Sequence, residues 1–102
     1  FVLMDMFLDA GIDCYESIQT NAVGMDLPNL IRHFGDRLCI WGAVPLEVLN
    51  QGTPGDARRE VRRCLEQGKS APGFILGPSH SIAFGTEYDN FMAMLDEFDK
   101  LR

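Results

Sequence analysis

The sequence predicts a single α/β domain in which parallel strands alternate with helices. Apolar residues at helical spacing alternate along the chain with short apolar runs, and residues 37–44 are apolar on both faces, as in a strand covered by helices. Strand connections of this kind are right-handed, so consecutive strands run parallel. The 102 residues leave room for one core.

The first predicted elements are a helix over 1–10 and a strand over 12–18. Apolar side chains recur at helical spacing in the helix: Phe1, Met4, Phe7 and Leu8. Gly11 stands where a left-handed C-terminal cap is expected. The strand assignment depends mainly on position, because residues 12–18 lie between this helix end and the polar segment 19–21.

A second helix is predicted after Asp26, a suitable N-cap, and ends at Gly35. Pro28 fits because amides of the first turn lack partners in any case. The buried stripe is formed by Leu27, Leu30, Ile31 and Phe34. The strand over 37–44 follows, and His33 near the helix end suits capping of the last carbonyl groups.

A third helix begins after Thr53, where Pro54 and Asp56 complete a capping-box pattern. Its buried stripe comprises Ala57, Val61, Cys64 and Leu65. The opposite face carries four arginines with interleaved glutamates, which predicts a solvated surface: Arg58, Arg59, Arg62 and Arg63.

The last strand is predicted at 74–76 and is followed by a final helix. Thr86 and Asp89 have the spacing of a second capping box, which would open this helix. Its predicted apolar side comprises Phe91, Met94, Leu95 and Phe98.

Composition excludes several classes of partner. A net charge of −6 with nine Lys and Arg argues against nucleic acid and anionic membranes, and no apolar run approaches the roughly 18 residues of a membrane span. Three unpaired cysteines suit free thiols in the cytoplasm. The missing initiating methionine suggests a chain that begins inside a longer protein, although a removed leader would look the same.

Three parallel strands leave two sheet edges without partners. We therefore expect the chain to form a homo-oligomer or to belong to a larger sheet or barrel. A third hypothesis is that the chain is a non-catalytic domain whose unpaired sheet edges bind a partner.

His80 is the foremost candidate for a functional residue. The apolar run 73–77 stops at Pro78, and the imidazole follows directly, where the carboxyl end of a parallel strand collects ligands and catalytic groups. A loop histidine without a function is the plain alternative. Four further residues lie at or near predicted strand ends and could line the same site as His80, which we call the mouth: Asp13, Gln19, Trp41 and Ser79. Trp41 also suits the core.

The order of several motifs resembles the C-terminal third of the uroporphyrinogen decarboxylase family. The matching segments run almost end to end: residues 11–13, 19, 24–26, 34–38, 41–42, 52–54, 73–80 and 87–94. The family's members are (β/α)8 barrels, so the resemblance implies part of a TIM barrel. The three strands would be the sixth to eighth of that barrel.

For the decarboxylases, the resemblance implies removal of carboxyl groups from tetrapyrrole acetate side chains, without a cofactor. His80 matches the histidine that follows the eighth strand, where it would bind a substrate carboxylate or support proton delivery. The family's aspartate that holds the pyrrole nitrogens has no counterpart here. The isolated chain is therefore expected to be inactive.

A second branch of the family implies a different activity, zinc-dependent methyl transfer between a corrinoid and a thiol. His80 occupies the position of that branch's last cysteine ligand and is the one metal ligand this chain would offer. Cys14, Cys39 and Cys64 are expected to be structural thiols, because their predicted positions do not converge on His80.

Overall fold

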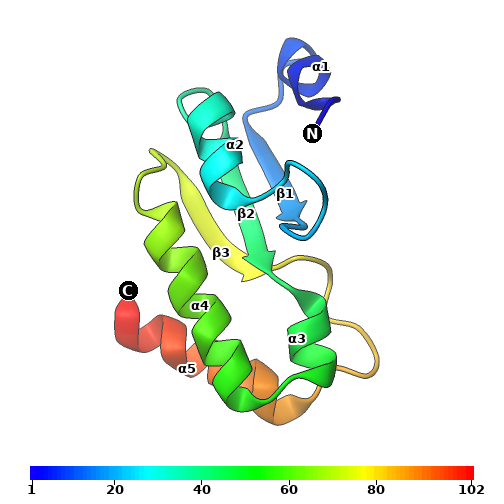
Figure 1. Ribbon diagram of the computed structural model, residues 1–102, viewed down its shortest axis with the longest axis vertical. Helices are drawn as coiled ribbons and strands as arrows, with labels where there is room; N and C mark the ends of the chain where they lie inside the picture. The colour runs from blue at the N-terminus through cyan, green and yellow to red at the C-terminus, as the bar shows by residue number, and fades with distance from the viewer.

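The computed structural model describes residues 1–102, and it confirms three parallel strands alternating with helices. The helices are α1 (Met4–Asp9), α2 (Leu27–Phe34), α3 (Leu46–Gln51), α4 (Pro54–Gly68) and α5 (Tyr88–Leu101). The strands are β1 (Cys14–Ile18), β2 (Cys39–Val44) and β3 (Phe74–Pro78), in the sheet order β1-β2-β3 (Figure 1). This arrangement is consistent with part of a TIM barrel.

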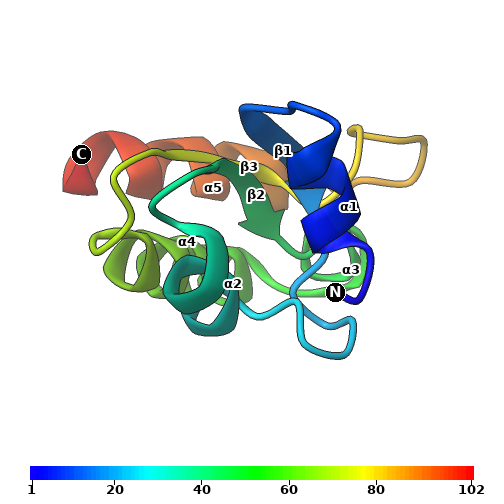
Figure 2. The ribbon, with the colours of Figure 1, turned by 90° about the horizontal axis from the view of Figure 1, so that it is seen from above.

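The sheet has one face covered by helices and one uncovered face. Figure 2 shows α2 and α4 together on the same side of the strands. Tyr15, Ile40 and Phe74 form one row across the three strands and pack in the core on that side. Alternating positions point the other way. We define the uncovered face by Cys14, Cys39, Trp41 and Ile75; the last two side chains are 39% and 43% exposed.

The two predicted N-caps before α2 and α4 are confirmed. The Asp26 side chain accepts a hydrogen bond of 3.0 Å from the Asn29 amide. At α4, the Asp56 amide donates to Thr53 Oγ1 at 3.1 Å, and the Thr53 amide donates to Asp56 Oδ2 at 2.9 Å. Local polar signals therefore determine where these helices begin.

The prediction missed one helix and misread one cap. Helix α3 was not expected, because a six-residue helix between Pro45 and Gly52 carries too little periodicity to be recognised. At α5, Thr86 is not a cap: the helix begins at Tyr88, and the Thr86 hydroxyl donates to Asn50 Oδ1 at 2.7 Å. The side chain that resembled a cap instead ties the loop to α3.

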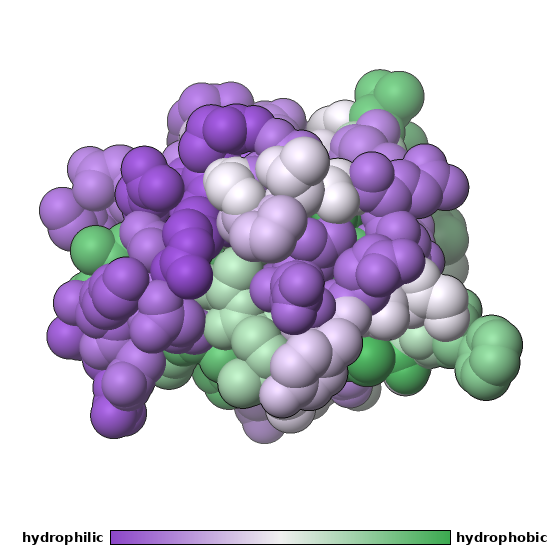
Figure 3. Space-filling view, turned by 90° about the horizontal axis from the view of Figure 1, so that it is seen from below, coloured by the Kyte–Doolittle hydropathy of each residue, from purple (hydrophilic) through white to green (hydrophobic).

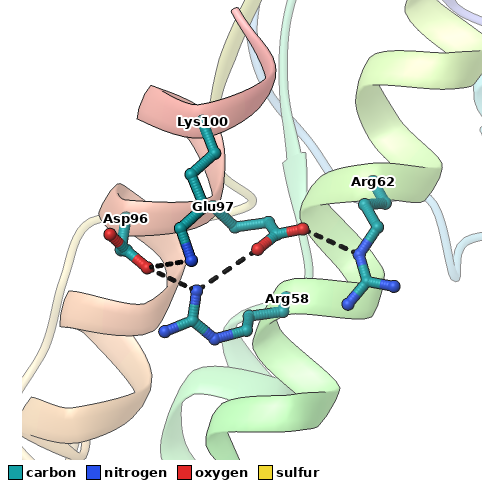
Figure 4. A network of polar contacts seen from close by, with 5 residues as sticks. All are labelled: Arg58, Arg62, Asp96, Glu97 and Lys100. Atoms are coloured by element: carbon teal, nitrogen blue, oxygen red, sulfur yellow. Dashed lines mark hydrogen bonds and ion pairs between the residues drawn. The ribbon is translucent and has the colours of Figure 1, made fainter.

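Ion pairs join helix α5 to helix α4 (Figure 4). Arg58 contacts Asp96 and Glu97 at 2.7 and 3.2 Å, and Arg62 contacts Glu97 at 2.8 Å. Hydrogen bonds from Arg58 and then Lys100 lower the pKa of Asp96. The arginine face of α4 is thus partly a helix interface and not wholly a solvated surface.

The buried stripe of α5 also differs from the prediction. Met94 is buried as expected, but Leu95 is 43% exposed, and Phe91 and Phe98 are only partly buried. The other buried positions of this helix are Asn90, Ala93 and Glu97. Polar side chains that bond to neighbouring elements have shifted the buried face by one position.

No helix of the structure has the length and apolar character that crossing a membrane requires.

Candidate functional site

The carboxyl ends of all three strands meet at one edge of the sheet, because the strands run parallel (Figure 1). Gln19 follows β1, Pro45 follows β2, and Ser79 with His80 follows β3. Ligands of parallel α/β proteins bind beyond this edge. The topology therefore places His80 and Gln19 where the sequence predicted a mouth.

Ser79 and His80 are adjacent in sequence but differ in their surroundings. Ser79 is buried; its amide donates to the Val44 carbonyl oxygen at 2.7 Å, and its Oγ accepts from the Leu46 amide at 3.0 Å. His80 is exposed, and its Nδ1 lies 3.4 Å from the Ser81 carbonyl oxygen. Ser79 therefore fixes the end of β3 to the start of α3, and the His80 imidazole extends beyond this anchor into solvent.

Gln19 lies just after an irregularity in β1. Ser17 adopts a positive φ of 64°, and the pairing with β2 shifts between Tyr15 and Ile18. Bulges of this kind redirect the chain at strand ends. The Gln19 carbonyl oxygen then accepts from the Ala22 amide at 3.1 Å, which closes a turn and leaves the Gln19 side chain exposed.

Trp41 lies within β2 on the uncovered face, and its indole ring lies against Gly77 of β3. A Cβ at Gly77 would be 3.1 Å from Trp41 Nε1, so glycine provides the room for the ring. The indole is 39% exposed. Trp41 is therefore available to a ligand on this face, and it does not belong to the core between sheet and helices.

Asp13 does not share the mouth, in contrast to the expectation. It precedes Cys14, the first residue of β1, and its carbonyl oxygen accepts from the Cys39 amide at 2.9 Å. It thus lies at the amino edge of the sheet, opposite His80. Strand direction decides this placement, since the start and the end of a short strand look alike in sequence.

The loop after His80 presents apolar side chains that the sequence analysis did not single out. Ile82 and Phe84 of this loop are exposed, Phe84 fully so, and Tyr88, the first residue of α5, is exposed as well. Figure 3 views the molecule from the end toward which the strands point; hydrophilic residues dominate, with hydrophobic ones in separate patches. The sequence could have indicated this exposure, because Ile82 and Phe84 fall in a segment that was predicted to be a loop.

The three cysteines lie apart from His80. Burial raises the pKa of the Cys64 thiol to about 11. Cys14 is exposed and Cys39 half-buried; partial burial and then the Cys39 side chain raise the pKa of the Cys14 thiol. No three histidine, cysteine, aspartate or glutamate side chains come together as a metal site.

The fold and this edge define a parallel α/β protein with a histidine at the carboxyl end of its last strand. A family model, Uroporphyrinogen decarboxylase (URO-D), matches residues 2–101. The chain therefore belongs to the uroporphyrinogen decarboxylase family. Searches of curated proteins and of solved structures gave no match.

Proposed function

We propose that this chain forms the sixth to eighth β/α units of a uroporphyrinogen decarboxylase-type barrel. In the intact protein, that barrel would remove carboxyl groups from the acetate side chains of a tetrapyrrole. The observation that carries the proposal is the exposed His80 imidazole at the carboxyl end of β3, in a chain that the family model matches over residues 2–101. We propose that this decarboxylation proceeds without a cofactor.

The chemistry of the edge suits such a substrate. A tetrapyrrole combines apolar ring faces with peripheral carboxylates. The His80 N–H can donate to a carboxylate, and a charged imidazole would strengthen that bond. The neighbouring Ile82 and Phe84 side chains offer apolar contact area. Gln19 and Trp41 are further candidates for substrate contacts. Ser79 would hold the end of β3 in place through its hydrogen bonds to Val44 and Leu46.

Binding of uroporphyrin, followed by fluorescence titration, tests the role of His80. We expect H80A to weaken binding about tenfold, the effect of losing one charge-assisted hydrogen bond. The matched control is H33A. His33 is also exposed, but it lies at the end of α2, where Nδ1 is 2.8 Å from the Asn29 carbonyl oxygen. Equal affinities for H80A and the unaltered chain would refute a carboxylate-binding role for His80.

The 102-residue chain should bind a tetrapyrrole without decarboxylating it. The resemblance assigns the aspartate that holds the pyrrole nitrogens to a part of the barrel that precedes these strands. Incubation of uroporphyrinogen with the 102-residue chain, analysed by chromatography, should show no loss of carboxyl groups. Rapid decarboxylation would mean that these strands hold the whole catalytic apparatus.

Zinc-dependent methyl transfer from a corrinoid is the alternative activity within the family. The donor set of this chain does not form that site by itself, because His80 has no second or third ligand grouped with it. Metal analysis of a longer form of the protein would distinguish the two activities, since methyl transfer requires stoichiometric zinc.

The unpaired edges of β1 and β3 favour a second property, association through the sheet. Each edge presents backbone groups that a further parallel strand could pair with, and Trp41 and Ile75 are exposed between them. We expect the purified chain to self-associate, or to bind the preceding part of the barrel when that part is supplied. Light scattering at increasing concentration should give a mass above that of one chain; a constant monomer mass would argue against self-association.

A further inference from the structure

Cys14 and Cys39 occupy facing positions on neighbouring strands, and no part of the proposed function uses them. Cys14 of β1 and Cys39 of β2 are direct partners in the parallel register. We propose that these two residues form an oxidisable dithiol, which closes to an intramolecular disulfide when the chain meets a small-molecule disulfide. The modification would join β1 to β2 on the uncovered face of the sheet.

The backbone fixes both thiols on the same face. The next pair in the register, Tyr15 and Ile40, packs against the core, so Cys14 and Cys39 lie on the opposite side. Neighbouring strands are about 4.8 Å apart. That spacing falls within the range of roughly 4.4–6.8 Å between Cα atoms joined by a disulfide. The hydrogen bond from the Cys39 amide to the Asp13 carbonyl oxygen, 2.9 Å long, holds the register at this point.

The third strand leaves room for the sulfur atoms. Gly73, directly before β3, lies beside Cys39, and a Cβ at Gly73 would be 3.3 Å from Cys39 Sγ. In the 102-residue chain, the Cys14 side is open to solvent because Cys14 is exposed and β1 is an edge strand. A small disulfide can therefore approach Cys14 first.

The reaction is a two-step thiol–disulfide exchange. The Cys14 thiolate attacks one sulfur of the small disulfide, breaks its S–S bond and releases one thiolate. The Cys39 thiolate then attacks the Cys14 sulfur, forms the protein disulfide and expels the second thiolate. The two cysteines lose two electrons, the small disulfide gains them, and the two cysteine protons pass through solvent to the released thiols.

Cys64 provides an internal contrast. It is fully buried in α4, and its pKa of about 11 keeps it protonated. A buried thiol of this kind reacts only when the chain unfolds. In the folded protein, oxidation should therefore select the Cys14–Cys39 pair among the three cysteines.

The test uses the full chain with oxidised glutathione at about pH 9.5, because the Cys14 thiolate is the attacking group and the pKa of the Cys14 thiol is raised. Trypsin cleaves after Arg32, Arg37 and Arg58, so Cys14 and Cys39 fall in peptides 1–32 and 38–58. We expect these peptides to be joined, the intact mass to fall by about 2 Da, and the melting temperature to rise by about 10 °C. Reduction should reverse all three changes.

The variants separate this pair from general thiol oxidation. C64S should behave like the unaltered chain, whereas C14S and C39S should give only a glutathione adduct, without linked peptides. Because Cys14 is exposed, C14S tests the proposal without disturbing the core. A stable adduct on Cys14 with Cys39 still reduced, a link that includes Cys64, or a disulfide between two chains would each overturn the proposal.

Discussion

Replacing Asn90 by aspartate should lower the free energy of unfolding by about 3–5 kcal/mol, the cost of a buried charge without a partner. Asn90 is 2% exposed. Its Nδ2 donates to the carbonyl oxygens of Val48, Leu49 and Gly52 at 3.4, 3.1 and 2.8 Å. An aspartate of the same shape would place a carboxylate against three acceptors. Urea denaturation followed by circular dichroism measures the change.

The neighbouring residue offers a matched control. Asp89→Asn exchanges the same two side chains in the opposite direction at an exposed position of the same helix turn. It should alter the free energy of unfolding by no more than about 0.5 kcal/mol. If Asn90→Asp also stayed within about 1 kcal/mol of the unaltered chain, then Asn90 would not be what holds α5 to α3 and to Gly52 at its end.

Gly42→Ala should destabilise the chain by about 2–4 kcal/mol, because it combines backbone strain with a collision. Gly42 has a φ of +151°, and an added Cβ would lie 2.9 Å from the Ile18 backbone nitrogen and 3.1 Å from Ile18 Cβ. Both atoms belong to β1 and cannot move without opening the pairing of β1 with β2. Thermal unfolding and urea titration should both report the loss.

Gly55→Ala is the control for this substitution. Gly55 lies in the first turn of α4, where a new Cβ would meet only Thr53 Oγ1, at 3.7 Å. We expect a neutral change or a gain of about 0.5 kcal/mol, since alanine restricts the unfolded chain. Equal losses from the two substitutions would contradict the close approach of β1 to Gly42.

Elements with strong local signals could be predicted from the sequence, and those that depend on distant partners could not. Thr53 with Asp56 marks the start of α4 through bonds within one turn. Thr86 with Asp89 has the same spacing, yet Thr86 bonds to Asn50 in another helix. The sequence alone does not show which of two such patterns will find a competing partner.

The same limit applies to the candidate site. His80 could be placed because it directly follows an apolar run, and the topology puts it at the carboxyl end of β3. Asp13 was misplaced because it stands at the amino end of β1, and the amino ends of parallel strands lie at the edge opposite to the one where ligands bind. The pairing of Arg58 and Arg62 with Glu97 depends on how α5 crosses α4, and nothing in the composition of either helix specifies it.

The strand order β1-β2-β3 follows the order of the chain, so each strand pairs with the one synthesised just before it. During translation, β2 can therefore dock as soon as it leaves the ribosome, and β3 can extend the growing sheet without waiting for a remote segment. We infer that the nascent polypeptide gains structure in steps of one β/α repeat, with the newest strand always the one that still lacks a neighbour.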